Sequence, residues 1–93
     1  MVYVDPIAPC LASRRWRWDH SCHLYADTAE ELHRFAPRLG LRHSWFQAKD
    51  DLPHYDLTRG LRALAIRLGA VETDREHVVE YMRRRKTVET RPR

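Results

Sequence analysis

The feature that most constrains the fold lies at residues 22–40, where a strand pattern passes directly into a helix pattern. The first five of these residues alternate between small apolar and polar or aromatic side chains, which is typical of a strand covered on a single face. Thr28 and Glu31 then have the spacing of a capping box, and an apolar stripe follows that Gly40 is suited to end. A strand that turns at once into an amphipathic helix predicts helices packed on a sheet.

The alternation also predicts which side chains face the core. It places small and apolar side chains on one face and polar or aromatic ones on the other: Cys22, Leu24 and Ala26 inward, and His23, Tyr25 and Asp27 outward. Further short strands are expected at 2–4, 44–47 and 70–72, with a long loop over 6–19. Because a strand–helix–strand connection is right-handed and joins parallel strands, we expect the strands at 22–26 and 44–47 to be parallel.

Two more helices are expected after residue 54. The first is capped by Asp56 or Thr58 and ends at Gly69, and the second opens with Thr73 and Glu76. In the helix that follows Thr28, a proline removes a backbone donor, so that helix kinks or ends a turn early at Pro37. The inward residues of the last helix are predicted to be Val78, Val79 and Met82.

These elements predict a small two-layer α/β sandwich of three to four short strands, partly parallel, with about three helices. The chain has 93 residues, enough for one domain, which we place at 1–82, followed by a basic C-terminal tail at 83–93. The tail carries a balance of +5, whereas residues 1–82 carry −1. Apolar runs near the 20 residues that cross a bilayer are missing, so we expect a cytoplasmic protein without a membrane partner. A core this small favours a homo-oligomer.

Two basic regions suggest contact with nucleic acid. Arg14, Arg15 and Arg17 alternate with Trp16 and Trp18, and indole beside guanidinium is suited to stack on bases and bind phosphates. The basic tail is suited to phosphate contacts that weaken with salt. The alternative interpretation is a tryptophan that anchors the loop with arginines in water, and a solvated, frayed tail.

Several segments together resemble a small domain-of-unknown-function family of bacteria and phages. The segments typical of that family occur here as H-L-Y-A-D at 23–27, E-L-H at 31–33, W-F-Q at 45–47 and P-H-Y-D at 53–56, with V-Y-V-D at 2–5. The resemblance covers about residues 2–72 and implies one compact domain, but it brings no activity with it. Pro37 departs from the helix usual at that place, and the basic tail lies outside the resemblance.

We expect the functional site among polar residues at strand ends and helix starts. If the strands are parallel, Asp27 and Gln47 emerge at the same edge, where α/β sheets bind ligands. The helix after residue 58 offers free N–H groups to an anion. The alternative is helix capping for the aspartates and core packing for the aromatic residues. The predicted ligand-binding residues are His23, Asp27, Trp45, Gln47, His54, Tyr55, Asp56 and Arg62.

Three classes of function compete. The sequence favours a binding module for a nucleotide or other phosphate-bearing small molecule, such as a phage-type sequestering protein, with no cofactor and no catalysis. The first alternative is a metal-dependent phosphoesterase or nuclease, although no H-x-H or H-E-x-x-H pattern places two ligands on one element. Its ligands would come from Asp5, His23, Asp27, His54 and Asp56. The second alternative is a nucleic-acid-binding adaptor. A P-loop, a nucleophile elbow and G-x-G-x-x-G are all missing from the sequence, which disfavours ATP hydrolysis and acyl transfer.

Overall fold

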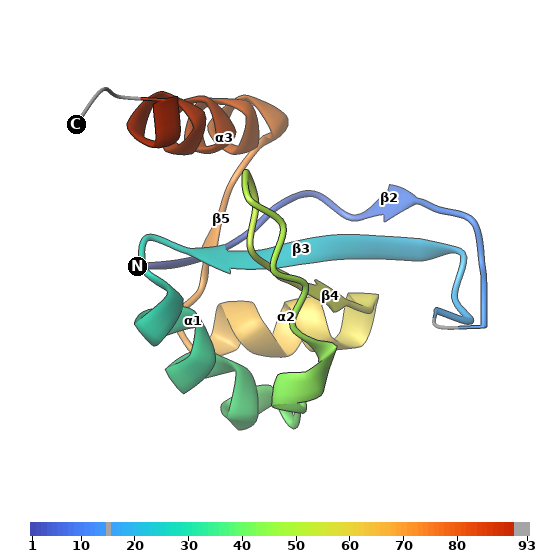
Figure 1. The fold of residues 1–93 in the computed structure, drawn as a ribbon. Helices are drawn as coiled ribbons and strands as arrows, with labels where there is room; N and C mark the ends of the chain where they lie inside the picture. The colour runs from blue at the N-terminus through green and yellow to red at the C-terminus, as the bar shows by residue number, and fades with distance from the viewer. Residues whose placement is uncertain (15, 91–93) are drawn as a thin grey trace.

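The computed structural model describes residues 1–14 and 16–90, with side chains up to residue 86. Its five strands form a mixed sheet, and three α-helices and two short 3-10 helices pack around it (Figure 1). The strands are β1 (Val2–Val4), β2 (Ala8–Pro9), β3 (His20–Ala26), β4 (Tyr55–Leu57) and β5 (Val71–Glu72). The helices are α1 (Ala29–Phe35), η1 (Ala36–Leu39), η2 (His43–Trp45), α2 (Arg59–Arg67) and α3 (Arg75–Thr90). The α/β class expected from the sequence is therefore confirmed.

β3 is the centre of the sheet. It pairs antiparallel with β1, β2 and β4, with His23 opposite Asp56 and Leu24 opposite Tyr55 in the β3–β4 pair. The parallel pair among the described strands is β1 with β5. The expected strand at 44–47 is wrong, because these residues form η2 and Gln47 makes an isolated bridge to His54. The expected parallel crossover from 22 to 47 is wrong for the same reason.

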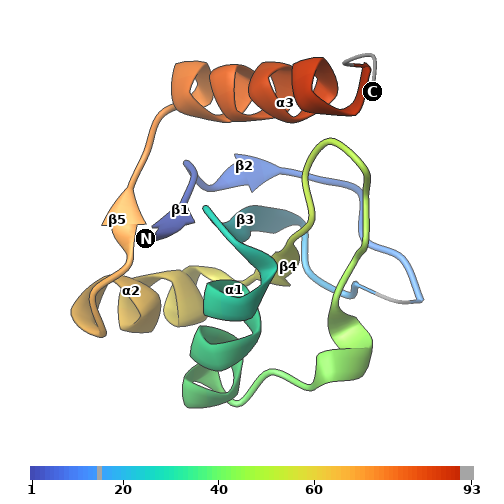
Figure 2. The ribbon, with the colours of Figure 1, turned by 60° about the vertical axis from the view of Figure 1, so that its left-hand side comes forward.

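The two faces of the sheet have different covers. Figures 1 and 2 show α1 and α2 on one side of the sheet and α3 on the other. The side toward α1 and α2 is the apolar core, built from Val4, Cys22, Leu24, Ala26 and Leu57 of the strands with Leu32, Phe35 and Ala65 of the helices. Such a core stabilises the fold by roughly 25 cal/mol for each Å² of apolar surface buried.

On the other side of the sheet, α3 covers one end of a polar face. Tyr25 was expected on an open face but is fully buried, because α3 packs over it. Its hydroxyl shares hydrogen bonds with Thr73 Oγ1 at 2.7 Å and with His77 Nδ1 at 2.8 Å. The Tyr81 hydroxyl donates to the Ala26 carbonyl at 2.6 Å. These bonds hold α3 over the C-terminal end of β3.

The ends of the first two α-helices follow the sequence signals. Thr28 and Thr58 accept from the backbone N–H groups of Glu31 and Leu61, which caps α1 and α2. α1 ends at Phe35 and continues as the tighter η1 through Pro37, and Gly40 then takes a left-handed φ of 78°.

The last helix differs from expectation at its start and on its inward face. The Asp74 carboxylate, and not Thr73, accepts from the first turn of α3, at the His77 N–H. Val79 is 47% exposed, so its inward placement is wrong, whereas Val78 and Met82 are half-buried. α3 continues past residue 82 to Thr90, and residues 91–93 of the predicted tail lie outside the described residues. In the described part of the chain, each helix is too short or too polar to cross a membrane.

Candidate functional site

The end of the polar face that α3 leaves open carries a histidine–aspartate cluster, which we define as Asp5, His23, His54 and Asp56. His23 lies opposite Asp56 across the β3–β4 pair, and His54 shares that face because it is two residues from Asp56. One nitrogen of each histidine and one oxygen of Asp56 all lie within 4.8 Å of one another. The two imidazole rings meet edge to face with their centroids 4.6 Å apart.

Asp5 fixes the orientation of His23. It is buried just after β1, and one carboxylate oxygen accepts the His23 backbone N–H at 2.6 Å. The other oxygen accepts the His23 Nδ1–H, also at 2.6 Å. Because Nδ1 carries the proton in this arrangement, Nε2 keeps its lone pair and is free to bind a cation.

His54 is held in the same tautomer by a different partner. Its Nδ1 donates to the Leu52 carbonyl at 2.6 Å, which leaves the lone pair on Nε2. That Nε2 lies 3.4 Å from Oδ1 of Asp56, and the Gln47 amide donates to the other oxygen of Asp56. Two imidazole nitrogens and a carboxylate are thus oriented toward one region by neighbours that engage their opposite sides.

The cluster shifts the pKa values of His23 and Asp56 in opposite directions. The hydrogen bond to Asp5 raises the pKa of His23, although burial acts in the opposite direction, and the charges of Asp5 and Asp56 add to the increase. Burial alone would raise the pKa of Asp56, but its interaction with His54, the hydrogen bond from the Gln47 amide and the nearby His23 imidazole hold it below its ordinary value. Asp56 is therefore ionised at neutral pH and attracts a cation.

Four of the eight predicted site residues lie in or beside this cluster, namely His23, Gln47, His54 and Asp56. The others lie elsewhere. Asp27 accepts from the Tyr3 hydroxyl at 2.8 Å and binds the Met1 amino group at the far end of β3. Tyr55 is buried on the core face, where its hydroxyl meets His33 Nδ1 at 2.9 Å.

Trp45 and Arg62 are also outside the cluster. Trp45 is 53% exposed on η2, with the Arg42 guanidinium 5.8 Å from its ring. Arg62 Nε donates to the Asp5 backbone carbonyl at 2.8 Å, and its Nη1 pairs with Glu72 at 3.2 Å. Arg62 thus ties α2 to the residue that orients His23. The expectation that Asp27 and Gln47 meet at one edge is wrong, because it required parallel strands at 22–26 and 44–47, and residues 44–47 form no strand.

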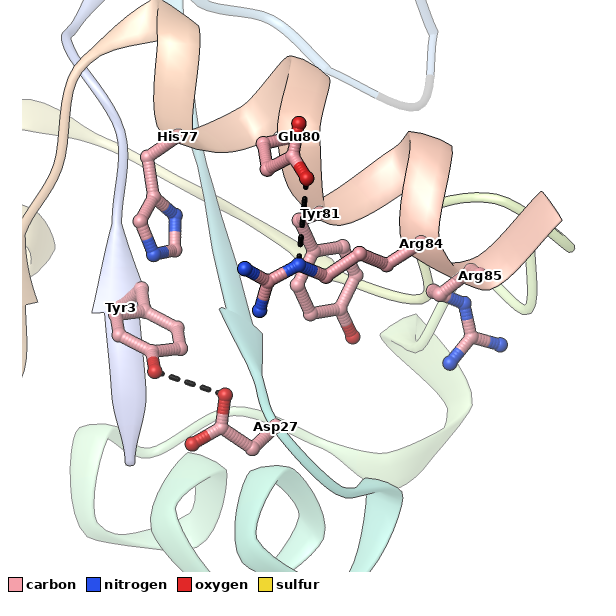
Figure 3. A pocket seen from close by; sticks show the side chains of 7 residues that line it. All are labelled: Tyr3, Asp27, His77, Glu80, Tyr81, Arg84 and Arg85. Atoms are coloured by element: carbon pink, nitrogen blue, oxygen red, sulfur yellow. Dashed lines mark hydrogen bonds and ion pairs between the residues drawn. The ribbon is translucent and has the colours of Figure 1, made fainter. Parts of the chain in front are cut away.

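A cavity of about 460 Å³ lies beneath α3, at the covered end of the polar face. Figure 3 shows the Tyr3 and His77 rings side by side, with centroids 4.6 Å apart, and the Tyr3 hydroxyl directed at Asp27. The residues that line this cavity are Tyr3, Asp27, His77, Glu80, Tyr81, Arg84 and Arg85. Asp27 is a predicted site residue, and Arg84 and Arg85 belong to the predicted basic tail, but no sequence pattern groups the seven as a site, because they come together only when α3 packs on the sheet. The alternating face of β3 is the one signal that pointed to this side.

Four of the five segments quoted from the sequence supply residues of the histidine–aspartate cluster or its neighbour Gln47. V-Y-V-D supplies Asp5, H-L-Y-A-D supplies His23, W-F-Q supplies Gln47, and P-H-Y-D supplies both His54 and Asp56. A family model described as "Protein of unknown function (DUF4031)" matches residues 2–85. That range extends beyond the expected 2–72 and takes in most of α3. The comparisons with curated proteins and with solved structures found no match.

Proposed function

The chain belongs to the DUF4031 family, and we propose that its histidine–aspartate cluster binds a divalent cation and hydrolyses phosphate esters. The ligands are His23 Nε2, His54 Nε2 and the Asp56 carboxylate. The observation that carries this proposal is that one possible ligand atom from each of His23, His54 and Asp56 lies within 4.8 Å of the others, on the open end of the polar face. This is the sequence's first alternative, the metal-dependent phosphoesterase, with Asp5 moved from ligand to orienting residue and Asp27 removed.

The tautomers support a cation in this position. With both Nδ1 atoms engaged, the Nε2 lone pair of His54 faces an oxygen of Asp56 at 3.4 Å. In this tautomer the two electron-rich atoms repel each other, and a metal cation between them would remove that repulsion. Carboxylate and carbonyl partners on the far nitrogens are also the usual outer shell of metal-binding histidines. Asp5 and Leu52 provide these partners here.

The ligand set fits a hydrolytic site. Two imidazoles and one carboxylate suit zinc and other first-row divalent ions, and three protein ligands leave positions for water and substrate. A bound divalent ion supplies Lewis acidity toward a phosphoryl oxygen and a water of lowered pKa. The chain's own residues hold the arrangement: Asp5 orients His23, and Gln47 fixes Asp56 through its amide.

Calorimetric titration of the full chain with Zn²⁺ and with Mn²⁺ tests this proposal, together with hydrolysis of bis-p-nitrophenyl phosphate. We expect one cation per chain, and loss of both binding and hydrolysis in His54→Ala and Asp56→Ala. His43→Ala is the matched control, because His43 is exposed and stacks 4.6 Å from another histidine, His33, away from the cluster. Circular dichroism shows whether each variant folds. Wild-type titrations without binding, or equal loss in His43→Ala, would overturn the proposal.

A second candidate is the nucleotide or phosphate-ligand binding that the sequence favours, and the cavity beneath α3 supports it. Tyr3, His77 and Tyr81 offer rings on which a base can stack, and Arg84 offers a cation. In a thermal unfolding scan without metal, nucleoside phosphates should raise the Tm of the wild type. Arg84→Gln, which removes an exposed pair with Glu80, should abolish the increase. An unchanged Tm for the wild type across a panel of nucleotides would exclude this candidate.

A further inference from the structure

Residues 10–19, which we call the Trp-Arg loop, form an extension of the sheet that the proposed function leaves unused. The Cys10 N–H donates to the Asp19 carbonyl at 2.8 Å and closes the base of the loop. At the base, Trp16 Nε1 donates to the His20 carbonyl at 3.2 Å. Figure 1 shows this loop projecting past the first residues of β3, at the end of the sheet away from the C-terminus of α3. The loop is thus closed at its base, and residues 11–14 and 17–19 are exposed to solvent.

Apolar and cationic groups are exposed together on this loop. Trp18 is 43% exposed and Leu11 is 92% exposed, so both present apolar surface to solvent. The Arg17 guanidinium lies 4.8 Å from the centre of the Trp18 ring, and the Trp16 ring lies at the same distance on a tilted plane. The result is a small platform of indole and guanidinium planes.

We propose that the Trp-Arg loop binds single-stranded nucleic acid and delivers its phosphodiester backbone to the histidine–aspartate cluster. This inference rests on the proposed phosphoesterase function and names its substrate class. The exposed indole gives a surface for an unpaired base, and the arginines give charges for the phosphates. An unpaired base is needed because stacking on an indole requires a free base face.

The position of the loop relative to the cluster supports delivery. The loop joins β3 at His20, and His23 follows three residues later, a rise of about 10 Å along the strand. α3 covers the opposite end of β3, where Tyr81 packs on Tyr25, so this helix does not lie between the loop and His23. On this proposal, a nucleic acid strand stacked on Trp18 runs along β3 toward the place where the cation is expected.

Binding of a short fluorescein-labelled oligothymidylate, followed by fluorescence anisotropy in EDTA, tests the loop without any metal. Trp18→Ala should weaken binding by about tenfold or more, the loss of one stacked base. Arg17→Gln should weaken it and reduce the slope of log affinity against log salt by about one phosphate contact. A blunt double-stranded DNA of the same length should bind more weakly than the single strand.

The matched control is Trp45→Ala, which removes an indole that is also exposed and also faces an arginine, Arg42, on η2. This variant should bind like the wild type. Equal losses in Trp18→Ala and Trp45→Ala, undiminished binding in Trp18→Ala, or equal binding of the duplex would each overturn the inference. Because EDTA removes divalent ions, these outcomes are separate from the metal titrations that test the proposed function.

Discussion

Replacing Asp5 by asparagine should move a proton on His23 from one ring nitrogen to the other. Asp5 accepts two hydrogen bonds at 2.6 Å, one from the His23 backbone N–H and one from its Nδ1–H. Asparagine offers one oxygen and one NH₂ group. The backbone N–H can only donate, so the amide oxygen must face it and the NH₂ group must face Nδ1. Nδ1 then becomes the acceptor, the proton moves to Nε2, and the proposed ligand atom loses its lone pair.

The expected loss of metal affinity is about 10- to 100-fold, the range found for outer-shell partners of metal-binding histidines. This corresponds to about 1.4–2.7 kcal/mol of binding free energy. The free energy of unfolding should fall by less, by about 1 kcal/mol, because both hydrogen bonds persist while their charge assistance is lost.

Calorimetric titration with Zn²⁺ measures the affinity, and long-range ¹H–¹⁵N correlation spectra of the metal-free protein report the tautomer of each histidine. Asp19→Asn is the control, since Asp19 accepts from His20 Nδ1 at 2.9 Å on an exposed part of the chain. It should leave the affinity unchanged. A His23 tautomer that switches in Asp5→Asn while the Zn²⁺ affinity stays at the wild-type value would refute the reasoning, because His23 would then not be a ligand.

Two further predictions concern stability. Burial raises the pKa of both Tyr3 and Tyr25 to about 12, so a spectroscopic titration of the folded protein should show their phenolates forming well above pH 10. These neutral phenols contribute stability that is fully present below pH 10 and is lost as pH rises toward 12; ionisation of every tyrosine near pH 10 in the folded chain would contradict this. Leu24→Ala should lower the free energy of unfolding in urea by about 2–5 kcal/mol, because Leu24 is fully buried at the centre of β3. The same change at the exposed Leu11 should stay within about 0.5 kcal/mol, and similar values for the two would refute the assignment of the core.

The helices were more predictable than the strands because their ends are set by local chemistry. Thr28 and Thr58 cap the backbone of their own first turns, and Gly40 needs only its own freedom at positive φ. A strand also needs the edge of a neighbouring strand to pair with, and the alternation of side chains does not show whether such an edge is available. The side chains of residues 44–47 alternate in polarity, but these residues form no strand. Tyr55 and Leu57, by contrast, pair with β3 and are both buried. The cap of α3 moved to Asp74 because the Thr73 hydroxyl is taken by Tyr25 and Val4.

Strand β4 is not predicted from the sequence, and this explains why only some of the site residues could be predicted. The sequence pattern predicts all three of His54, Tyr55 and Asp56 as ligand-binding residues. In β4 and its bridge, side chains alternate, so His54 and Asp56 reach the open face while Tyr55 turns into the core. The role of Asp5 depends on a pairing between β1 and β3 that brings residues 18 positions apart within 2.6 Å. This is a tertiary contact, and local sequence patterns do not predict it.

The place of β1 in the middle of the sheet also bears on how the chain reaches its fold. The Val4 carbonyl accepts from the backbone N–H and the hydroxyl of Thr73, which lies 69 residues further along. Contacts over such separations form late, because the entropy of closing a long loop opposes them. During translation, β1 therefore leaves the ribosome with β3 as its first partner, and its second edge stays unpaired until β5 has been made. Until then, that edge is a template on which neighbouring nascent chains can associate.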